Sequence, residues 1–233
     1  MVLKLTSKTI AMWHNLHVTF MPKPIFGVPG SGMHTNLSLF QNGTNAFYDP
    51  DSKFGLSQTA LYFIGGVMKH AKGLTAITNP LVNSYKRLVS GYEAPVYIAW
   101  SHRNRSPLIR VPVARKNATR IELRSPDSAC NPYLSFAVIL SAGIDGIKKK
   151  ILPPDPVGEN IYHMDEVQLK KYGIENLPGN LKEALEEFKK DKVLQQGLTE
   201  HIVSNYLRAK YLEWESYSCH VHPWELDQYL TVY

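Results

Sequence analysis

The chain has 233 residues, 44% of them hydrophobic, which is enough to bury the core of one large domain. No apolar run approaches the length of a bilayer span, and residues 1–16 mix Lys, Thr, Trp and His. This excludes an ordinary signal peptide and predicts a cytoplasmic protein. Cys130 and Cys219 stand far apart, outside any metal-binding spacing, and are interpreted as packing residues of a protein from a reducing compartment.

The basic residues are unevenly distributed along the chain, whose formal net charge is +6. Seven arginines fall within the 38 residues from Arg87 to Arg124, whereas the lysines of the C-terminal third alternate with glutamates. Arginine forms bidentate hydrogen bonds to carboxylates and phosphates, so a cluster inside one folded region is typical of a site for a small anionic ligand. We therefore expect no nucleic-acid partner and no membrane partner.

The periodicity of apolar residues predicts an α+β chain. In its first part we expect helices over 4–15 and 56–71, the latter capped by Ser57, and strands over 18–24, 32–40, 96–101, 108–113 and 120–125. Pro112 has no N–H to donate, so the strand over 108–113 should be irregular there or lie at an edge.

The remaining residues are predicted to be mainly helical. Residues 131–151 have Pro132 at the helix start and lysines near the end, as the helix dipole favours, and are apolar nearly all round until Gly146, so this helix should be buried. A proline-rich linker follows over 152–162, with further helices over 180–191 and from about Thr199 to Ser216. Near the end of the chain, His220 and His222 have no third metal ligand nearby and are interpreted as structural.

Two predicted strands present a polar face opposite an apolar one. One carries His34, which follows a glycine-rich loop at 27–32 whose backbone can approach a ligand closely; the other carries Glu122 between Arg120 and Arg124. Taken singly, the histidine is most simply structural and the carboxylate is most simply part of an ion-pair ladder. If the strands are neighbours, His34 and Glu122 would bind a divalent cation and the arginines would bind an anion beside it, as phosphoryl transfer requires.

Longer motifs resemble those of one enzyme family. They are TFMPKPIFG and GSGMH within 19–34, NPLVNSYKRLVSGYEAP at 79–95, SHRNRSPLIRVP at 101–112 and RIELRSPDSACNPYL at 120–134. In this order, and continued by AGIDGIKKKI, GNLKEALEEF and HPWELDQY, they resemble glutamine synthetase of the bacterial type I class, in the shorter form of Gram-positive bacteria. The resemblance covers nearly the whole chain.

The resemblance implies a fold and an activity. The fold would be the glutamine synthetase/guanido kinase-like catalytic domain, an antiparallel sheet flanked by helices, present here in part. Residues 1–151 would hold the sheet and the site, and residues 152–233 the linker and C-terminal helical region of the same domain. The activity would be an ATP-dependent ligation with Mg²⁺ or Mn²⁺ as cofactor: glutamate is phosphorylated on its γ-carboxylate, and ammonia displaces the phosphate to give glutamine.

The resemblance also implies roles for single residues. His34 and Glu122 correspond to metal ligands, and Glu93 corresponds to a flap residue that closes the site over the acyl phosphate and accepts a proton from ammonium. The implied glutamate-binding residues are Gly30, Arg87, Arg105 and Arg124. The implied ATP-binding residues are Ser38, Arg105, Arg110 and Arg120. The implied catalytic residues are Glu93, Arg105 and Arg124.

Some features of the family have no counterpart here. The family takes most of its metal-binding carboxylates from an E-x-E strand and two later glutamates upstream of TFMPKP, whereas the EWE at 213–215 lies in a predicted helix. Pro29 stands where the family has Asn, and Ser90 where it has Pro. We therefore expect a C-terminal part of the catalytic domain, which needs the missing N-terminal half or neighbouring subunits of a homo-oligomeric ring for activity.

Other functions remain open from the sequence. The chain would otherwise be a catalytically inactive truncated copy, or an interaction module that binds a transcriptional regulator, as Gram-positive synthetases do. A guanidino-kinase-like phosphotransferase would share the broad fold but not these motifs.

Overall fold

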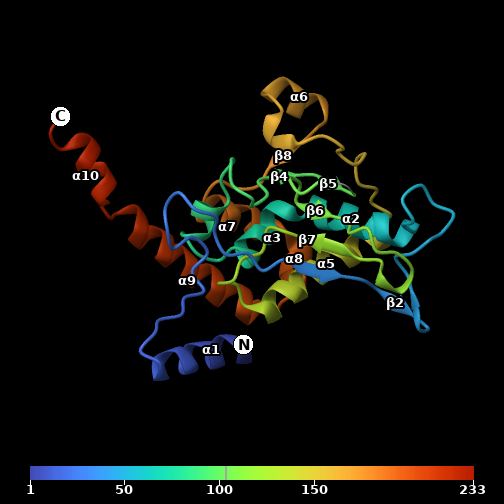
Figure 1. Cartoon of the computed structure of the whole chain (residues 1–233), viewed down its shortest axis with the longest axis horizontal. Coiled ribbons are helices and arrows are strands. Elements are labelled where there is room, and N and C mark those ends of the chain that lie inside the picture. Colours follow the sequence, from blue (N-terminus) through green and yellow to red (C-terminus); the bar gives the residue numbers. More distant parts are fainter. Residues whose placement is uncertain (103) are drawn as a thin grey trace.

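The computed structural model describes residues 1–102 and 104–233 and shows a small sheet with helices packed on one face (Figure 1). The α-helices are α1 (Val2–Trp13), α2 (Gln58–Lys69), α3 (Ala71–Thr78), α4 (Ser84–Arg87), α5 (Pro132–Lys149), α6 (Glu166–Lys171), α7 (Leu181–Lys190), α8 (Lys192–Gln196), α9 (Glu200–Ser218) and α10 (Pro223–Tyr229). The 3-10 helices are η1 (Lys116–Ala118) and η2 (Ile161–His163). The strands are β1 (Thr35–Leu37), β2 (Phe40–Gln41), β3 (Thr44–Asn45), β4 (Tyr97–Ile98), β5 (Trp100–Ser101), β6 (Ile109–Arg110), β7 (Ile121–Leu123) and β8 (Glu175–Asn176).

The central sheet aligns polar residues of three strands in one row. Its strand order is β1-β7-β6-β5, in which β7 is antiparallel to both neighbours and β6 is parallel to β5. Asn36, Glu122 and Arg110 lie opposite one another across β1, β7 and β6, while the adjacent pair Leu123 and Ile109 is buried. The predicted antiparallel sheet flanked by helices is confirmed, with the parallel β5–β6 pair as an addition.

Several predicted strands differ in the structure. Those over 32–40 and 96–101 are each interrupted and give β1 and β2, and β4 and β5, respectively. β6 ends before Pro112, as expected for a residue without an N–H. Residues 18–24 form no strand, so that prediction was wrong. A side chain satisfies this backbone instead: Asn83 Oδ1 accepts a hydrogen bond from the Lys23 N–H (2.8 Å), and Asn83 Nδ2 donates to the Lys23 carbonyl (2.9 Å).

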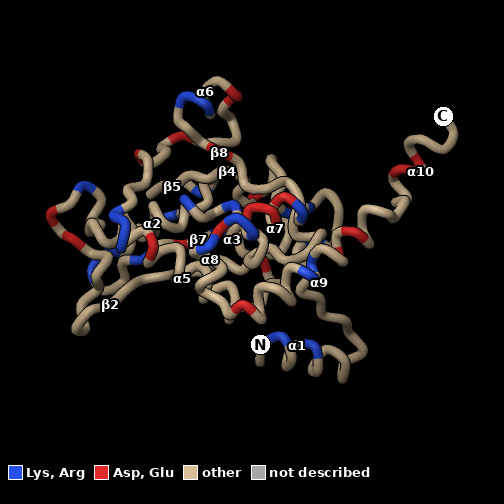
Figure 2. Tube along the Cα trace, turned by 180° about the vertical axis from the view of Figure 1, so that it is seen from behind, with Lys and Arg blue, Asp and Glu red and all other residues tan. Residues whose placement is uncertain are grey.

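The helices begin where their caps predict. Ser57 Oγ accepts a hydrogen bond from the Ala60 N–H (3.2 Å) at α2, and Asn180 Oδ1 accepts one from the Glu183 N–H (2.9 Å) at α7. α2 packs on α5 and α3 packs on α7, and their buried side chains form one core with the inner face of the sheet. Acidic and basic residues follow one another along the solvent side of α7 (Figure 2).

α5 is buried on one side only. Val138, Ile139 and Ala142 lie in the core. A stripe of apolar side chains on the other side is exposed: Tyr133, Phe136, Leu140 and Ile144. The predicted helix is therefore buried on one side, and the stripe on its other side is a continuous apolar surface, unlike the single scattered apolar residues of an ordinary surface.

The region after residue 152 is joined to the sheet region. β8 pairs with β4, and Trp100 Nε1 donates a hydrogen bond to the Pro154 carbonyl (2.6 Å), so the predicted linker runs along the domain. Beyond α9, α10 extends away from the rest of the chain (Figure 1). Among the described residues, no helix is both long enough and apolar enough to cross a bilayer. Cys130 is buried, but Cys219, which was expected to pack inside, is exposed.

Candidate active site

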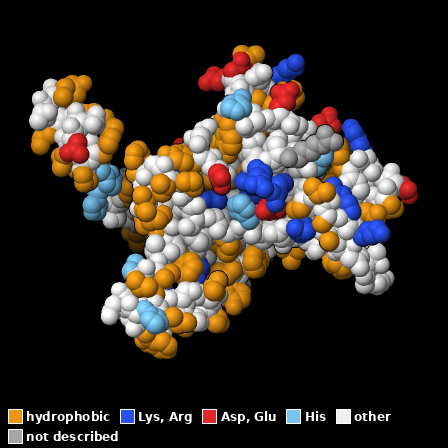
Figure 3. Space-filling view, viewed as in Figure 1, with side chains coloured by type: hydrophobic (Ala, Val, Ile, Leu, Met, Phe, Trp, Pro, Cys, Tyr) orange, Lys and Arg blue, Asp and Glu red, His pale blue; other side chains and the backbone are white. Residues whose placement is uncertain are grey.

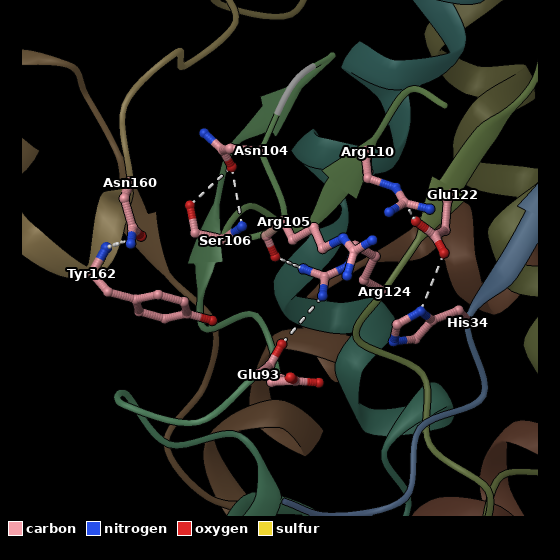
Figure 4. A pocket seen from close by; sticks show the side chains of 10 residues that line it. All are labelled: His34, Glu93, Asn104, Arg105, Ser106, Arg110, Glu122, Arg124, Asn160 and Tyr162. Atoms are coloured by element: carbon pink, nitrogen blue, oxygen red, sulfur yellow. Dashed lines mark hydrogen bonds and ion pairs between the residues drawn. The ribbon is translucent and has the colours of Figure 1, made fainter. Parts of the chain in front are cut away.

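Six of the ten predicted site residues gather around one cavity. Figure 3 shows basic side chains near the middle of this face, beside a histidine and acidic side chains. The cavity has a volume of about 520 Å³ and lies beside the polar row of the sheet (Figure 4). Its described lining consists of His34, Glu93, Asn104, Arg105, Ser106, Arg110, Glu122, Arg124, Asn160 and Tyr162. The cavity is thus lined by residues of the sheet, of the loop before β4, of the loop after β5 and of the η2 segment.

Glu122, at the centre of the polar row, lies between the Arg110 guanidinium and the His34 imidazole. It is 6% exposed, with Oε2 lying 2.6 Å from Arg110 Nε and Oε1 lying 3.2 Å from His34 Nδ1. Burial and the nearby Arg124 guanidinium lower the pKa of His34 below its ordinary value, although Glu122 opposes the shift. The imidazole is therefore neutral near pH 7, the form that binds a metal.

The donor atoms of this pair fit a divalent cation in part. A neutral imidazole and a carboxylate suit a hard or borderline divalent ion, but Mg²⁺ takes six ligands. Within the described part of the chain, no group of three His, Cys, Asp or Glu side chains is arranged to hold a metal. His34 and Glu122 therefore supply two ligands, and the others would have to be water, substrate oxygens or carboxylates from elsewhere.

The arginines of the cavity have different surroundings. Arg105 is exposed toward the cavity and forms no ion pair with a described residue (Figure 4). Arg124 is 4% exposed and donates to the backbone carbonyls of Arg105, Pro107 (3.3 Å) and Glu93 (3.3 Å). Three arginines against two glutamates leave excess positive charge, which suits an anion such as phosphate.

A hollow of about 60 Å³ adjoins the cavity and holds the other implied glutamate-binding residues. Its lining includes His34, Glu93 and Arg124 from the cavity, together with Gly30 and Arg87. Arg87 is 4% exposed and donates to the carbonyls of Ser125 (2.6 Å) and Arg124 (3.2 Å). These two hydrogen bonds hold the backbone just after β7.

The glycine-rich loop passes very close to Arg87. A Cβ on Gly32 would lie 2.6 Å from Arg87 Nη2, and a Cβ on Gly30 would lie 2.3 Å from the Pro22 carbonyl oxygen. Both contacts are far shorter than van der Waals distance. A side chain at Gly30 would push the loop away from the Pro22 backbone, whereas one at Gly32 would displace the hydrogen-bonded Arg87 side chain. The close backbone approach predicted for 27–32 is therefore directed at the chain's own Arg87 and Pro22.

Two implied ATP-binding residues lie outside both hollows. Ser38 is exposed beyond the end of β1. Arg120 donates from Nε to Asn36 Oδ1 (2.9 Å) and from Nη1 to the Ala118 carbonyl (3.2 Å). The structure does not bring Ser38 or Arg120 to the cavity.

The histidines near the C-terminus also lie apart from the cavity. His220 Nδ1 is 2.6 Å from the Ser216 carbonyl oxygen, and the His222 ring packs on Tyr217 with centroids 4.8 Å apart. The His222 N–H donates to Glu225 Oε2 (2.7 Å) at the start of α10. These contacts support the structural interpretation of the pair.

Four lining residues were missed by sequence reasoning: Asn104, Ser106, Asn160 and Tyr162. Asn104 Nδ2 donates to the carbonyls of Val157 (3.1 Å) and Glu159 (2.8 Å), and its Oδ1 accepts from the N–H and the hydroxyl of Ser106 (both 3.0 Å). The supposed linker thus forms a wall of the cavity. A non-periodic polar segment gives no sequence signal for such a position.

Comparisons with known proteins agree with this geometry. The profile of the family "Glutamine synthetase, catalytic domain" matches residues 1–229. The glutamine synthetase of Thermotoga maritima is 59% identical over 227 residues, which are 97% of this chain and 52% of that protein. The glutamine synthetase of Staphylococcus aureus, a Gram-positive bacterium, is 55% identical over 230 residues, which are 99% of this chain and 52% of that protein.

A solved structure agrees as well. The ligand-free structure of GmaS has a TM-score of 0.87 at 40% identity, over 98% of this chain and 52% of that one. The chain thus spans about half the length of the curated relatives it matches. With a family profile over nearly its whole length and relatives above 50% identity, the chain belongs to the glutamine synthetase family.

Proposed function

We propose that this chain forms the phosphate-binding part, and a portion of the metal-binding part, of an enzyme site that ligates ammonia to glutamate with ATP. The observation that carries the proposal is the cavity itself. Arg105, Arg110 and Arg124 surround a space beside the His34–Glu122 pair. Glutamate, ATP and ammonia are the substrates that this family membership favours.

The residues have distinct tasks in the proposed reaction. The γ-carboxylate oxygen of glutamate attacks the γ-phosphorus of ATP, which releases ADP and leaves an acyl phosphate. Arg105 and Arg110 bind the transferred phosphate, whose charge they balance. A divalent ion held in part by His34 and Glu122 would neutralise phosphate oxygens. Glu93 takes a proton from ammonium, the resulting ammonia attacks the acyl carbon, and the C–O bond breaks as phosphate leaves with the further proton that the nitrogen gives up.

Buried arginines position these groups. Arg124 donates to the carbonyls of both Arg105 and Glu93, so it fixes the loop of the phosphate-binding arginine relative to the loop of the proposed base. Arg87, with Gly30 beside it, lines the adjoining hollow, where we place the substrate glutamate. Water is excluded when the Glu93 loop closes, which protects the acyl phosphate from hydrolysis.

The proposed site needs further carboxylates. Two metal ligands cannot hold the ions that phosphoryl transfer requires, so activity should depend on a segment that the other half of the relatives supplies. The alternatives of an inactive copy or a regulator-binding module gain no support from the described residues. The division into 1–151 and 152–233 and the cytoplasmic location stay predictions.

Phosphate binding by the purified chain tests the proposal. Arg105→Ala should weaken the binding of inorganic phosphate by about tenfold or more, because a charge-assisted hydrogen bond is lost. Arg208→Ala removes an exposed arginine on α9 and is the matched control, expected to leave the affinity within twofold. Equal affinities for wild type and the Arg105 variant in calorimetry would contradict the proposal.

A further inference from the structure

The loop that carries Glu93 passes from exposed to buried within two residues. Residues 89–91 and Glu93 are exposed, whereas Ala94 is 6% exposed. The carbonyls of Glu93 and Ala94 are consecutive along the chain, and each accepts a hydrogen bond from a different element. Arg124 Nη2, just after β7, donates to the first (3.3 Å), and Tyr162 Oη, in η2, donates to the second (2.8 Å). These two bonds fix the point at which the exposed loop begins.

The η2 segment gives the Tyr162 hydroxyl a defined position. Asn160 Oδ1 accepts a hydrogen bond from the Tyr162 N–H (3.2 Å), and the Ile161 N–H donates to Ser106 Oγ (3.2 Å). The Ile161 side chain is fully buried. The segment is therefore held both by the core and by the turn that carries Arg105.

Tyr162 and Glu93 approach the cavity from the same side (Figure 4). Burial raises the pKa of Tyr162, so near neutral pH its hydroxyl stays protonated and donates. A bond to the backbone carbonyl next to Glu93 leaves the Glu93 carboxylate itself unoccupied by the tyrosine. Tyr162 thus acts on the position of the backbone next to Glu93.

We propose that Tyr162 is a positioning residue that holds the base of the Glu93 loop through the Ala94 carbonyl, so that Glu93 stays directed into the cavity. The role rests on the proposed function, in which Glu93 closes the site and accepts a proton. The segment that the sequence indicated to be a linker would thereby have a function, because η2 would connect the turn that carries Arg105 to the loop that carries Glu93.

The test compares two variants, each of which lacks one tyrosine hydroxyl. Tyr162→Phe keeps the aromatic ring, which packs on Tyr97 with centroids 6.1 Å apart, and deletes only the bond to Ala94. Tyr206→Phe is the matched control, because the Tyr206 hydroxyl also donates to a backbone carbonyl, that of Ala76 (2.6 Å), elsewhere in the core. Both variants lose the same kind of hydrogen bond.

Two measurements on the chain separate positioning from general stability. Ala94–Pro95 is the single Ala-Pro pair of the sequence, so ¹³C-carbonyl alanine with ¹⁵N proline gives one signal that reports the Ala94 carbonyl. This signal should shift upfield in Tyr162→Phe and stay in place in Tyr206→Phe. Amide hydrogen exchange from Gly91 to Ala94 should become about threefold to tenfold faster in Tyr162→Phe alone.

The outcomes distinguish this inference from the proposed function. An unmoved Ala94 signal in Tyr162→Phe, or equally faster loop exchange in both variants, would overturn the positioning role. The affinity of the wild type for inorganic phosphate, measured on the same preparation, tests the proposed function separately. If wild type binds no phosphate while the Ala94 signal still shifts only in Tyr162→Phe, the proposed function fails and the positioning role stands.

Discussion

Replacing Glu122 by Gln should have effects of opposite sign on stability and on anion binding. The substitution keeps the size of the side chain but removes the charge that lies 2.6 Å from Arg110 Nε. Breaking a fully buried ion pair costs about 3–5 kcal/mol. Since the Arg110 side chain is 28% exposed and can be hydrated, we expect about 1–2 kcal/mol here. With a urea m-value of about 3 kcal/mol/M, the unfolding midpoint should fall by about 0.5 M.

The same substitution should improve the binding of phosphate. Glu122 neutralises Arg110, so Glu122→Gln leaves a further positive charge facing the cavity. One extra unit charge at a partly hydrated site is worth about 1 kcal/mol, or about fivefold in affinity for inorganic phosphate. Mn²⁺ binding should weaken by at least roughly tenfold, because one of the two ligands of the chain loses its charge.

Urea unfolding followed by circular dichroism, and calorimetric titration with phosphate and with Mn²⁺, measure these effects. Glu187→Gln is the control, because Glu187 forms an exposed ion pair with Lys190 (2.8 Å) on α7 and does not line the cavity. It should change stability by less than about 0.5 kcal/mol and binding not at all. Unchanged or weaker phosphate binding by Glu122→Gln would refute the reasoning.

Two further predictions concern stability. His70 is buried between Asp191 Oδ2 (2.5 Å from Nδ1) and Asp145 Oδ2 (3.2 Å from Nε2); burial opposes its charge, but these carboxylates outweigh burial and raise its pKa. Its stabilising effect should be complete below about pH 6.5 and disappear as pH rises through the raised pKa, so His70→Asn should lower the unfolding free energy more at pH 6 than at pH 9. Equal losses at the two pH values would contradict this. Because the apolar stripe of α5 is exposed, the thermal midpoint should rise with protein concentration, and Phe136→Ser should abolish that dependence. A concentration-independent midpoint in wild type would show that the stripe drives no association.

Sequence periodicity was sufficient to predict the polar face of the sheet. Alternation placed His34 and Glu122 on polar faces, and their meeting depended on whether the two strands are neighbours. β1 pairs with β7 and the two side chains lie 3.2 Å apart, so that condition is met. Such a prediction works because a one-residue slip would turn buried residues such as Leu123 to solvent.

Bonds between segments remote in sequence could not be predicted in this way. The Asn83 amide replaces a partner strand for Lys23 across 60 residues, and the pattern of residues 18–24 does not reveal it. Likewise, Asn104 and Tyr162 join the cavity loops through carbonyls, which every residue carries. Periodicity reports which face is buried, but not which polar side chain satisfies a distant backbone group.

Glutamine formation by a chimeric enzyme tests most directly whether this chain carries the phosphate-binding part of a glutamine synthetase site. The chain would replace the matching 227 residues of the Thermotoga maritima enzyme, and ¹⁵N-ammonium would be followed into glutamine in the presence of ATP and Mg²⁺. We predict turnover by the chimera, a loss of about tenfold or more with Arg105→Ala, and none by the chain alone. A folded chimera that binds ATP but forms no glutamine, or one that is unaffected by Arg105→Ala, would contradict the proposed site.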